Sequence, residues 1–112
     1  MRDPEKTAGL FKLFGVPARV RIVQLLKGRT LCVGALAARL GVSSAAVSQH
    51  LRILHDAGLV EREKRANFVH YRLDERRLAE CRRLMDGVLS IPQGSEEEGP
   101  CVRSADARSR SG

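Results

Sequence analysis

Apolar residues along this chain follow a helical period up to Gly58 and a different pattern after it. Up to that glycine they recur every three or four positions, as in helices that bury one face. The next two segments, residues 59–64 and 68–73, are strand-like runs, and the polar tripeptide 65–67 between them suits a hairpin tip. A helical period then returns. The pattern predicts a mainly α fold with a β-hairpin, in the order α-α-α-α-β-β-α.

Glycines, a proline and capping residues predict where these helices begin and end. Pro17 suits the first position of a helix, where its missing N–H would have no partner in any case. Gly41 suits the left-handed position that follows a helix, and Thr30 and Asp74 are the expected N-caps of the third and last helices. The expected helices are one that packs Leu10, Phe11, Leu13 and Phe14 on one face and stops near Gly15, one from Pro17 that Gly28 ends, and then Cys32 to Leu40, Ser44 to Ala57, and 75 to Leu89.

The third and fourth predicted helices form a helix-turn-helix. Two helices joined by a short turn that contains glycine are typical of this motif, and Gly41 supplies the bend. In the fourth helix Val47, Leu51 and Leu54 recur at i, i+4 and i+7, so we expect them to face inward. The opposite side of that helix is then exposed, and the hairpin that follows it is a wing. The predicted fold class is a winged helix-turn-helix.

The residues on that exposed side have the chemistry to bind DNA. Glutamine and arginine form paired hydrogen bonds with base edges in the major groove, and serine bonds to bases as well. Hydroxyl and N–H groups at a helix N-terminus bind phosphate. Polar residues at the wing tip suit phosphate or minor-groove contact. The candidate DNA-binding residues are Ser43, Ser44, Ser48, Gln49, His50, Arg52, Lys64, Arg65 and Asn67.

Each of these residues also has a simpler explanation. Ser48 and Gln49 are common on solvated helix surfaces, and an ion pair of Arg52 with Asp56, one turn on, stabilises a helix by only about 0.2–0.5 kcal/mol. DNA contact or plain surface is expected for the three histidines, which do not converge by spacing: His50, His55 and His70. What favours DNA is that the candidates share one face of a helix in a helix-turn-helix.

The charge of the chain fits a nucleic-acid partner. Its 112 residues carry a formal net charge of +7. Residues 1–89 hold 17 Lys and Arg against 9 Asp and Glu, whereas residues 90–112 hold 3 against 4. Such a positive field attracts polyanions such as double-stranded DNA, although it also serves solubility. We expect one folded domain over residues 1–89 and a disordered tail over 90–112, which is rich in Gly, Pro and Ser.

The sequence gives little support to other classes of protein. The longest mainly apolar run, residues 31–38, is far shorter than the roughly 20 residues of a membrane-spanning helix, and the N-terminus lacks the apolar stretch of a signal peptide. Three widely spaced cysteines then indicate reduced thiols and a cytoplasmic protein. The sequence shows no Cys-x-x-Cys motif, no glycine-rich phosphate loop and no Ser/His/Asp group, so no motif indicates an enzyme. We expect that the protein requires no cofactor. The alternative is a winged-helix adaptor for another protein, which steep salt dependence of DNA affinity would exclude.

Several stretches of the chain resemble the ArsR/SmtB family of small dimeric winged-helix repressors. These stretches, within about residues 8–89, are 14–26 (FGVPARVRIVQLL), 31–37 (LCVGALA), 47–51 (VSQHL) with Leu54 and 57–60, and 70–73 (HYRL). The resemblance implies a homodimer joined through the first and last helices, which binds an inverted repeat of operator DNA. It also implies release from DNA on sensing a metal, a metalloid or a thiol-reactive signal.

Cys32 stands where metal-sensing members of that family place the first cysteine of a Leu-Cys-Val-Cys-Asp-Leu box. Here Gly34 and Ala35 replace the second cysteine and the acid. A thiophilic ion such as As(III) prefers several thiolates, so its other ligands would have to be Cys101, in the tail, and Cys81. Cys81 lies on the apolar stripe of the last helix, where a buried structural cysteine is the expected role.

Two alternatives to a metalloid inducer stay open. Cys32 and Cys101 form a redox or persulfide switch if they close to a disulfide or polysulfide bridge. Otherwise the chain senses a signal without thiols, or none. The zinc site that some family members build on the last helix is not expected, because residues 75–77 (ERR) begin that helix and Val88 and Ile91 stand near its end.

Overall fold

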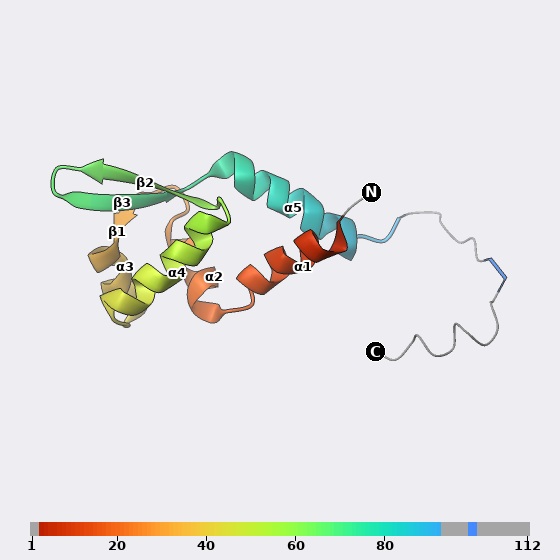
Figure 1. Cartoon of the computed structure of the whole chain (residues 1–112), viewed down its shortest axis with the longest axis horizontal. Coiled ribbons are helices and arrows are strands. Elements are labelled where there is room, and N and C mark those ends of the chain that lie inside the picture. The colour runs from red at the N-terminus through yellow and green to blue at the C-terminus, as the bar shows by residue number, and fades with distance from the viewer. Residues whose placement is uncertain (1–2, 93–98, 101–112) are drawn as a thin grey trace.

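Helices make up most of the fold, and a three-stranded sheet carries the hairpin. The computed structural model describes residues 3–92 and 99–100. In that part of the chain the elements are α1 (Pro4–Leu13), α2 (Pro17–Leu25), β1 (Leu31–Cys32), α3 (Val33–Leu40), α4 (Ser44–Asp56), β2 (Val60–Arg65), β3 (Phe68–Leu73) and α5 (Glu75–Leu89). The helices α1 and α5 lie side by side at one end, and the β2–β3 hairpin extends at the other, beside α3 and α4 (Figure 1). The predicted winged helix-turn-helix is confirmed.

Capping chemistry explains where the helices begin and end. The Asp3 carboxylate accepts hydrogen bonds from N–H groups of the first turn of α1, at 3.1 and 3.4 Å. Asp74 accepts one from the N–H of Arg77 at 3.0 Å and begins α5. Pro17 begins α2 as predicted. Gly41 ends α3 with φ = 71°, a left-handed conformation that glycine adopts without a steric penalty.

The start of α3 differs from the prediction. Leu31 and Cys32 are not helical; they form β1, which pairs antiparallel with β3, so that the strand order is β1-β3-β2. The helix begins at Val33, with Cys32 in the N-cap position and without a side-chain cap, so the prediction of Thr30 as the cap was wrong. The reason is the free edge of β3, whose backbone N–H and C=O groups gain partners from an extended segment and not from a helix.

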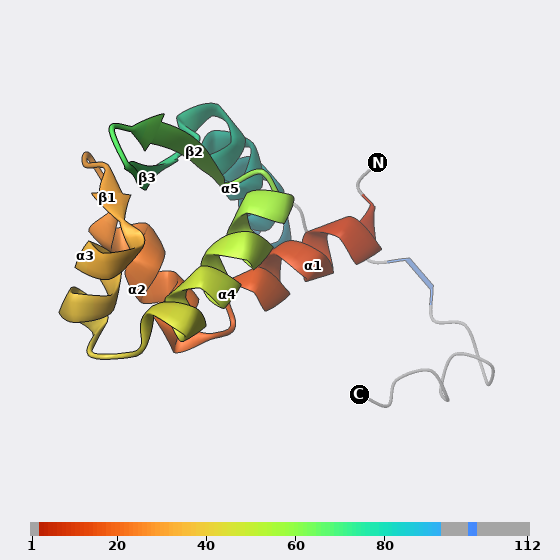
Figure 2. The ribbon, with the colours of Figure 1, turned by 60° about the vertical axis from the view of Figure 1, so that its left-hand side comes forward.

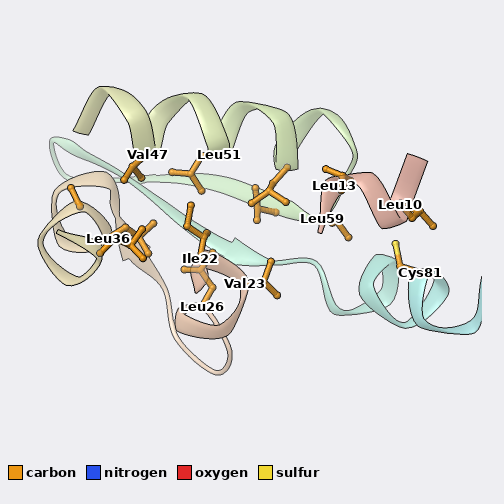
Figure 3. Packing of buried hydrophobic residues seen from close by; sticks show 14 residues of the cluster. Leu10, Leu13, Ile22, Val23, Leu26, Leu36, Val47, Leu51, Leu59 and Cys81 are labelled. Carbon is orange, nitrogen blue, oxygen red and sulfur yellow. The ribbon is translucent and has the colours of Figure 1, made fainter. Parts of the chain in front are cut away.

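The hydrophobic core joins α4 to the rest of the helices. Val47 and Leu51 of α4 point toward Ile22 and Leu36, and all four are almost fully buried (Figure 3). At the other end of the cluster Cys81 of α5 lies among apolar side chains, which confirms the buried position expected for it. The core consists of Leu10, Leu13, Ile22, Val23, Leu26, Leu36, Ala37, Leu40, Val47, Leu51, Leu54, Leu59, Val60 and Cys81.

One predicted core residue is not in the core. Leu10 and Leu13 of α1 are buried, but Phe11 is 36% exposed and Phe14 only partly covered. Successive helical residues are separated by 100°, so Phe11 lies beside the face that Leu10 and Leu13 share rather than on it. The aromatic ring of Phe11 is therefore available at the surface near α5.

The prediction of a tail over residues 90–112 falls mostly outside the described residues. Residues 90–92 and 99–100 belong to no helix or strand, and Cys101 lies outside the described part. None of the helices described is both long and apolar enough to cross a membrane.

Candidate nucleic-acid interface

The helix α4 has one buried face and one exposed face. Its apolar residues Val47, Leu51 and Leu54 are at most 1% exposed. The opposite side carries exposed polar side chains, which we call the recognition face: Ser44, Ser48, Gln49 and Arg52. The core thus holds α4 by one side only, and the hydrogen-bonding groups of the other side are free for a partner. Figure 2 shows this helix along the outside of the fold.

Two of the predicted DNA-binding residues lie at the margin of the recognition face. Ser43 is the N-cap of α4, and its hydroxyl oxygen accepts a hydrogen bond from the N–H of Ala46 at 3.1 Å. That hydroxyl still has its hydrogen to donate. His50 is half-buried, and its Nδ1 atom is buried without a hydrogen-bond partner among the described residues.

The hairpin has two faces with different electrostatics. Residues that pair across the strands share a face, and neighbours along a strand lie on opposite faces. The register pairs Arg62 with Tyr71 and Lys64 with Val69, and this face looks toward α4. Arg65 is paired with Phe68 instead and lies on the other face. The sequence alone treated Lys64 and Arg65 as equivalent, and the structure separates them.

Ion pairs cover the face of the hairpin that looks away from α4. Arg65 Nε donates to Glu63 Oε2 at 2.8 Å. Arg72 binds Glu61 at 2.9 Å and Glu63 at 3.1 Å. The hydrogen bond from Arg65 holds the pKa of Glu63 below its ordinary value, and the bond to Glu61 raises the pKa of Arg72. The guanidinium of Arg65 is therefore engaged within the hairpin, whereas no described carboxylate pairs with Lys64.

A polar cleft of about 380 Å³ lies between α4 and the inner face of the hairpin. Its lining comes from three elements: Ser48, Leu51, Arg52, His55 and Asp56 of α4, Arg62 of β2 and Tyr71 of β3. The carboxylate of Asp56 lies 4.0 Å from Nδ1 of His55, and Asp56 does not form the ion pair with Arg52 that was the simpler explanation for that arginine. Arg62 and Tyr71 were not among the predicted site residues. The two-residue period of the strand would have placed Arg62 on the same face as Lys64.

The two cysteines in the described part of the chain, Cys32 and Cys81, are both free thiols in different surroundings. Cys32 is half-buried at the edge of the sheet, where it pairs with His70 of β3. Cys81 is 1% exposed in the core, and burial raises the pKa of its thiol. Nowhere in residues 3–92 and 99–100 do three or more His, Cys, Asp or Glu side chains gather as they would around a metal ion. Any soft ion at Cys32 would need ligands from outside these residues or from another copy of the chain.

Comparison with known proteins agrees with this architecture. Residues 16–62 match the family model for bacterial regulatory proteins of the arsR family. The chain is 34% identical over 87 residues to the uncharacterized HTH-type transcriptional regulator MJ1325 of Methanocaldococcus jannaschii, covering 77% of this chain and 98% of that protein. It is 33% identical to the biofilm growth-associated repressor of Agrobacterium fabrum, over 82% and 76% of the two chains.

Among solved structures, a possible transcriptional regulator for arsenical resistance superposes with a TM-score of 0.68 and 41% identity, over 73% of this chain and 85% of that one. The relatives are transcriptional regulators and not enzymes. Together with the exposed face of α4 and the hairpin beside it, these matches show that the chain belongs to the ArsR/SmtB family of DNA-binding winged-helix transcriptional repressors.

Proposed function

We propose that this protein acts in the cytoplasm as a homodimer that binds an inverted repeat in double-stranded operator DNA and represses transcription. The observation that carries the proposal is the recognition face of α4. A helix held by a fully buried apolar stripe presents the opposite side to solvent, and that side fits the width of the major groove.

Some side chains of the recognition face would contact base edges, and others would contact the sugar–phosphate backbone. Gln49 has the donor and the acceptor that read an adenine edge, and Arg52 has the paired donors that read a guanine edge. Ser44, in the first turn of α4, is placed to bind a phosphate at the N-terminus of the helix. The hairpin then reaches the flanking backbone with Lys64, whose ammonium group has no partner among the described carboxylates.

An apolar groove between α1 and α5 supports a dimer through the first and last helices. It is lined by Pro4, Thr7, Ala8, Phe11, Leu84, Gly87 and Val88. Val88, which lines the groove, and its neighbour Leu89 are 60% and 69% exposed, which is unusual for two adjacent large apolar side chains. A second copy packed here by two-fold symmetry would bury them and would place two α4 helices to read the two halves of an inverted repeat.

Binding to an operator selected from genomic DNA tests the proposal. Gln49→Ala and Arg52→Ala should each weaken binding to the selected duplex by roughly 1–3 kcal/mol and relax sequence preference, because each removes contacts with a base. Arg76 is an exposed arginine of α5 that belongs neither to α4 nor to the hairpin, so Arg76→Ala is the matched control and should bind as the wild type does. If both recognition-face variants keep wild-type affinity and preference, α4 does not read the operator.

For the inducer, we propose a thiophilic metal or metalloid such as As(III), bound through Cys32. The support is the position of Cys32 in the stretch that resembles the family's metal-binding box, together with the similarity to a possible regulator for arsenical resistance. Cys101 would supply a second thiolate. Cys81 fits less well, because it is buried and its pKa is raised.

A thiol redox or persulfide switch through Cys32 is the alternative that Gly34 favours, since this residue leaves no second cysteine in the box. Release of the wild type and of the variants Cys32→Ser, Cys81→Ser and Cys101→Ser from DNA separates the two. Release by arsenite that Cys32→Ser abolishes supports the metalloid. Release by a polysulfide alone, reversed by dithiothreitol, supports the redox switch. Normal release of Cys32→Ser by arsenite contradicts the metalloid site, and normal release of Cys32→Ser by the polysulfide contradicts the redox switch.

A further inference from the structure

The cleft between α4 and the hairpin has a lining that suits an anion. It combines two guanidinium groups, of Arg52 and Arg62, with the hydroxyls of Ser48 and Tyr71. Neither arginine has an ion pair or a side-chain hydrogen bond within the described residues. This contrasts with Arg65 and Arg72 on the opposite face of the same hairpin, which bind glutamates. The basic groups on the face of the hairpin toward α4 are therefore not neutralised by ion pairs within the described residues.

The cleft also has a fixed shape. Leu51, at 1% exposure, closes its floor from the α4 side. Tyr71 packs against the core while it lines the cleft, and it pairs with Arg62 on one side and with Leu31 on the other. The strand β3, which carries Tyr71, is therefore paired on both sides, and β2, which carries Arg62, pairs with it at the edge of the sheet. Asp56 is the one acidic side chain among the lining residues, and its carboxylate lies 4.0 Å from Nδ1 of His55.

The path of duplex DNA identifies the anion, provided that the proposed function holds. If α4 lies in the major groove and the hairpin tip reaches the adjacent minor groove, the sugar–phosphate strand that separates those grooves passes between them. The cleft is the space between α4 and the hairpin. We propose that it is a phosphodiester-binding notch, in which Arg52 and Arg62 hold one backbone phosphate of the operator and the Tyr71 hydroxyl donates a further hydrogen bond.

The notch gives residues outside the recognition face, above all Arg62, a role in DNA binding. A guanidinium binds a phosphate through two parallel N–H···O bonds, a geometry that lysine lacks. Arg62 then positions the hairpin on the backbone without reading sequence. Arg52, which both lines the notch and belongs to the recognition face, contacts the backbone as well as the groove.

Operator binding by Arg62→Gln, with Arg76→Gln as control, tests the notch. Arg62 is exposed, so the variant should fold as the wild type does. We expect about tenfold weaker binding, equal for the selected duplex and a scrambled one, because a hydrogen-bonded charge is lost and no base contact changes. The slope of log K against log salt should fall by about 1. Tyr71→Phe should weaken binding slightly, and Asp56→Asn should strengthen it.

Duplexes with single neutral methylphosphonate linkages show whether one phosphate is responsible. For the wild type, one position in each half-site should weaken binding, and the same substitution should have a smaller effect on Arg62→Gln, in which only Arg52 and Tyr71 remain to hold the phosphate. An unchanged salt slope for Arg62→Gln, or a methylphosphonate effect that is as large in that variant as in the wild type, would overturn the notch. So would inorganic phosphate, at constant ionic strength, if it displaced DNA from the wild type but not from Arg62→Gln, since the cleft would then be a site for free phosphate. If instead the wild type fails to prefer the selected duplex, the proposed function itself is wrong.

Discussion

The left-handed turn after α3 allows a clean measurement of what one glycine contributes to the fold. Gly41 has φ = 71°, and a Cβ built on it would meet no heavy atom within 4 Å. Gly41→Ala therefore introduces no clash with neighbours, and its whole cost is the steric strain of an L-residue in the left-handed region. That strain is roughly 1–2 kcal/mol for alanine. Gly41→Asn should cost less, because asparagine tolerates this conformation better.

Gly34, at the beginning of the same helix, is the matched control. A Cβ there also meets nothing within 4 Å, and its φ is not in the left-handed region. Alanine replaces a residue that is unfavourable in helices, so Gly34→Ala should be neutral or stabilising by up to about 0.5 kcal/mol. The two substitutions add the same methyl group to the two ends of one helix, and they should shift stability in opposite directions.

Thermal and urea unfolding at one fixed protein concentration measure the difference, since a dimer's Tm depends on concentration. In a domain of this size 1 kcal/mol shifts the Tm by roughly 4–8 °C, so Gly41→Ala should melt several degrees below the wild type and well below Gly34→Ala. The reasoning fails if Gly41→Ala is as stable as the wild type, or if both variants move in the same direction.

Four further outcomes follow from the hairpin and the thiols. Lys64→Ala should reduce the salt slope of DNA binding by about 1, whereas Arg65→Ala should change it less, because the Arg65 guanidinium is already ion-paired within the hairpin; equal effects would contradict the two-faced hairpin. Iodoacetamide at neutral pH should alkylate Cys32 before Cys81, because burial and a raised pKa keep the Cys81 thiol protonated. Since the pKa of the Cys81 thiol is raised in the folded state, the contribution of this thiol to stability is present at neutral pH and is lost as the pH rises through and above the ordinary thiol range near 8.5. Faster labelling of Cys81 than of Cys32 would contradict a buried thiol. Stability that stays flat in alkali for the wild type and falls for Cys81→Ala would contradict the raised pKa. Gly34→Cys, at a position with room for a side chain, should lower the arsenite concentration that releases DNA, and an unchanged concentration would place the metalloid site elsewhere.

The features that could be predicted from the sequence are those that one residue determines locally. Gly41 after α3, Pro17 at the start of α2 and Asp74 before α5 each satisfy or avoid a backbone requirement at their own position. The inward face of α4 follows in the same way from the spacing of Val47 and Leu51. Such requirements do not depend on the rest of the fold, and the structure confirms them.

The strand β1 could not be predicted in this way. Leu31 and Cys32 lie at the start of an apolar run whose composition suits a helix equally well. They are extended because β3, about forty residues later in the chain, offers an unpaired edge. A two-residue strand has no periodicity of its own, so only the partner reveals it.

The alternation of acidic and basic residues along β2 can be seen in the sequence but is easily overlooked. In most amphipathic strands apolar and polar residues alternate, whereas in β2 glutamates alternate with basic residues from Glu61 to Lys64. The same two-residue period that sorts apolar from polar residues here sorts acids from bases. A strand made almost wholly of charged residues thus has one face of ion pairs with β3 and one face of unpaired basic groups toward α4.

The short strand β1 also determines how an inducer at Cys32 would act on DNA binding. Cys32 pairs with His70 of β3 and precedes the first residue of α3, which packs on α4. A ligand bound at Cys32 would therefore act on the hairpin and on the helix-turn-helix together, without contacting the side chains of the recognition face. If DNA is held on both sides of its backbone, displacing the hairpin from α4 weakens backbone contacts that every sequence shares. We therefore expect arsenite to lower the affinity of the wild type for scrambled and selected duplexes by similar factors, measured by fluorescence anisotropy at one salt concentration. A loss confined to the selected duplex would mean instead that the inducer alters dimer spacing or α4 itself, and that β1 is not the connection.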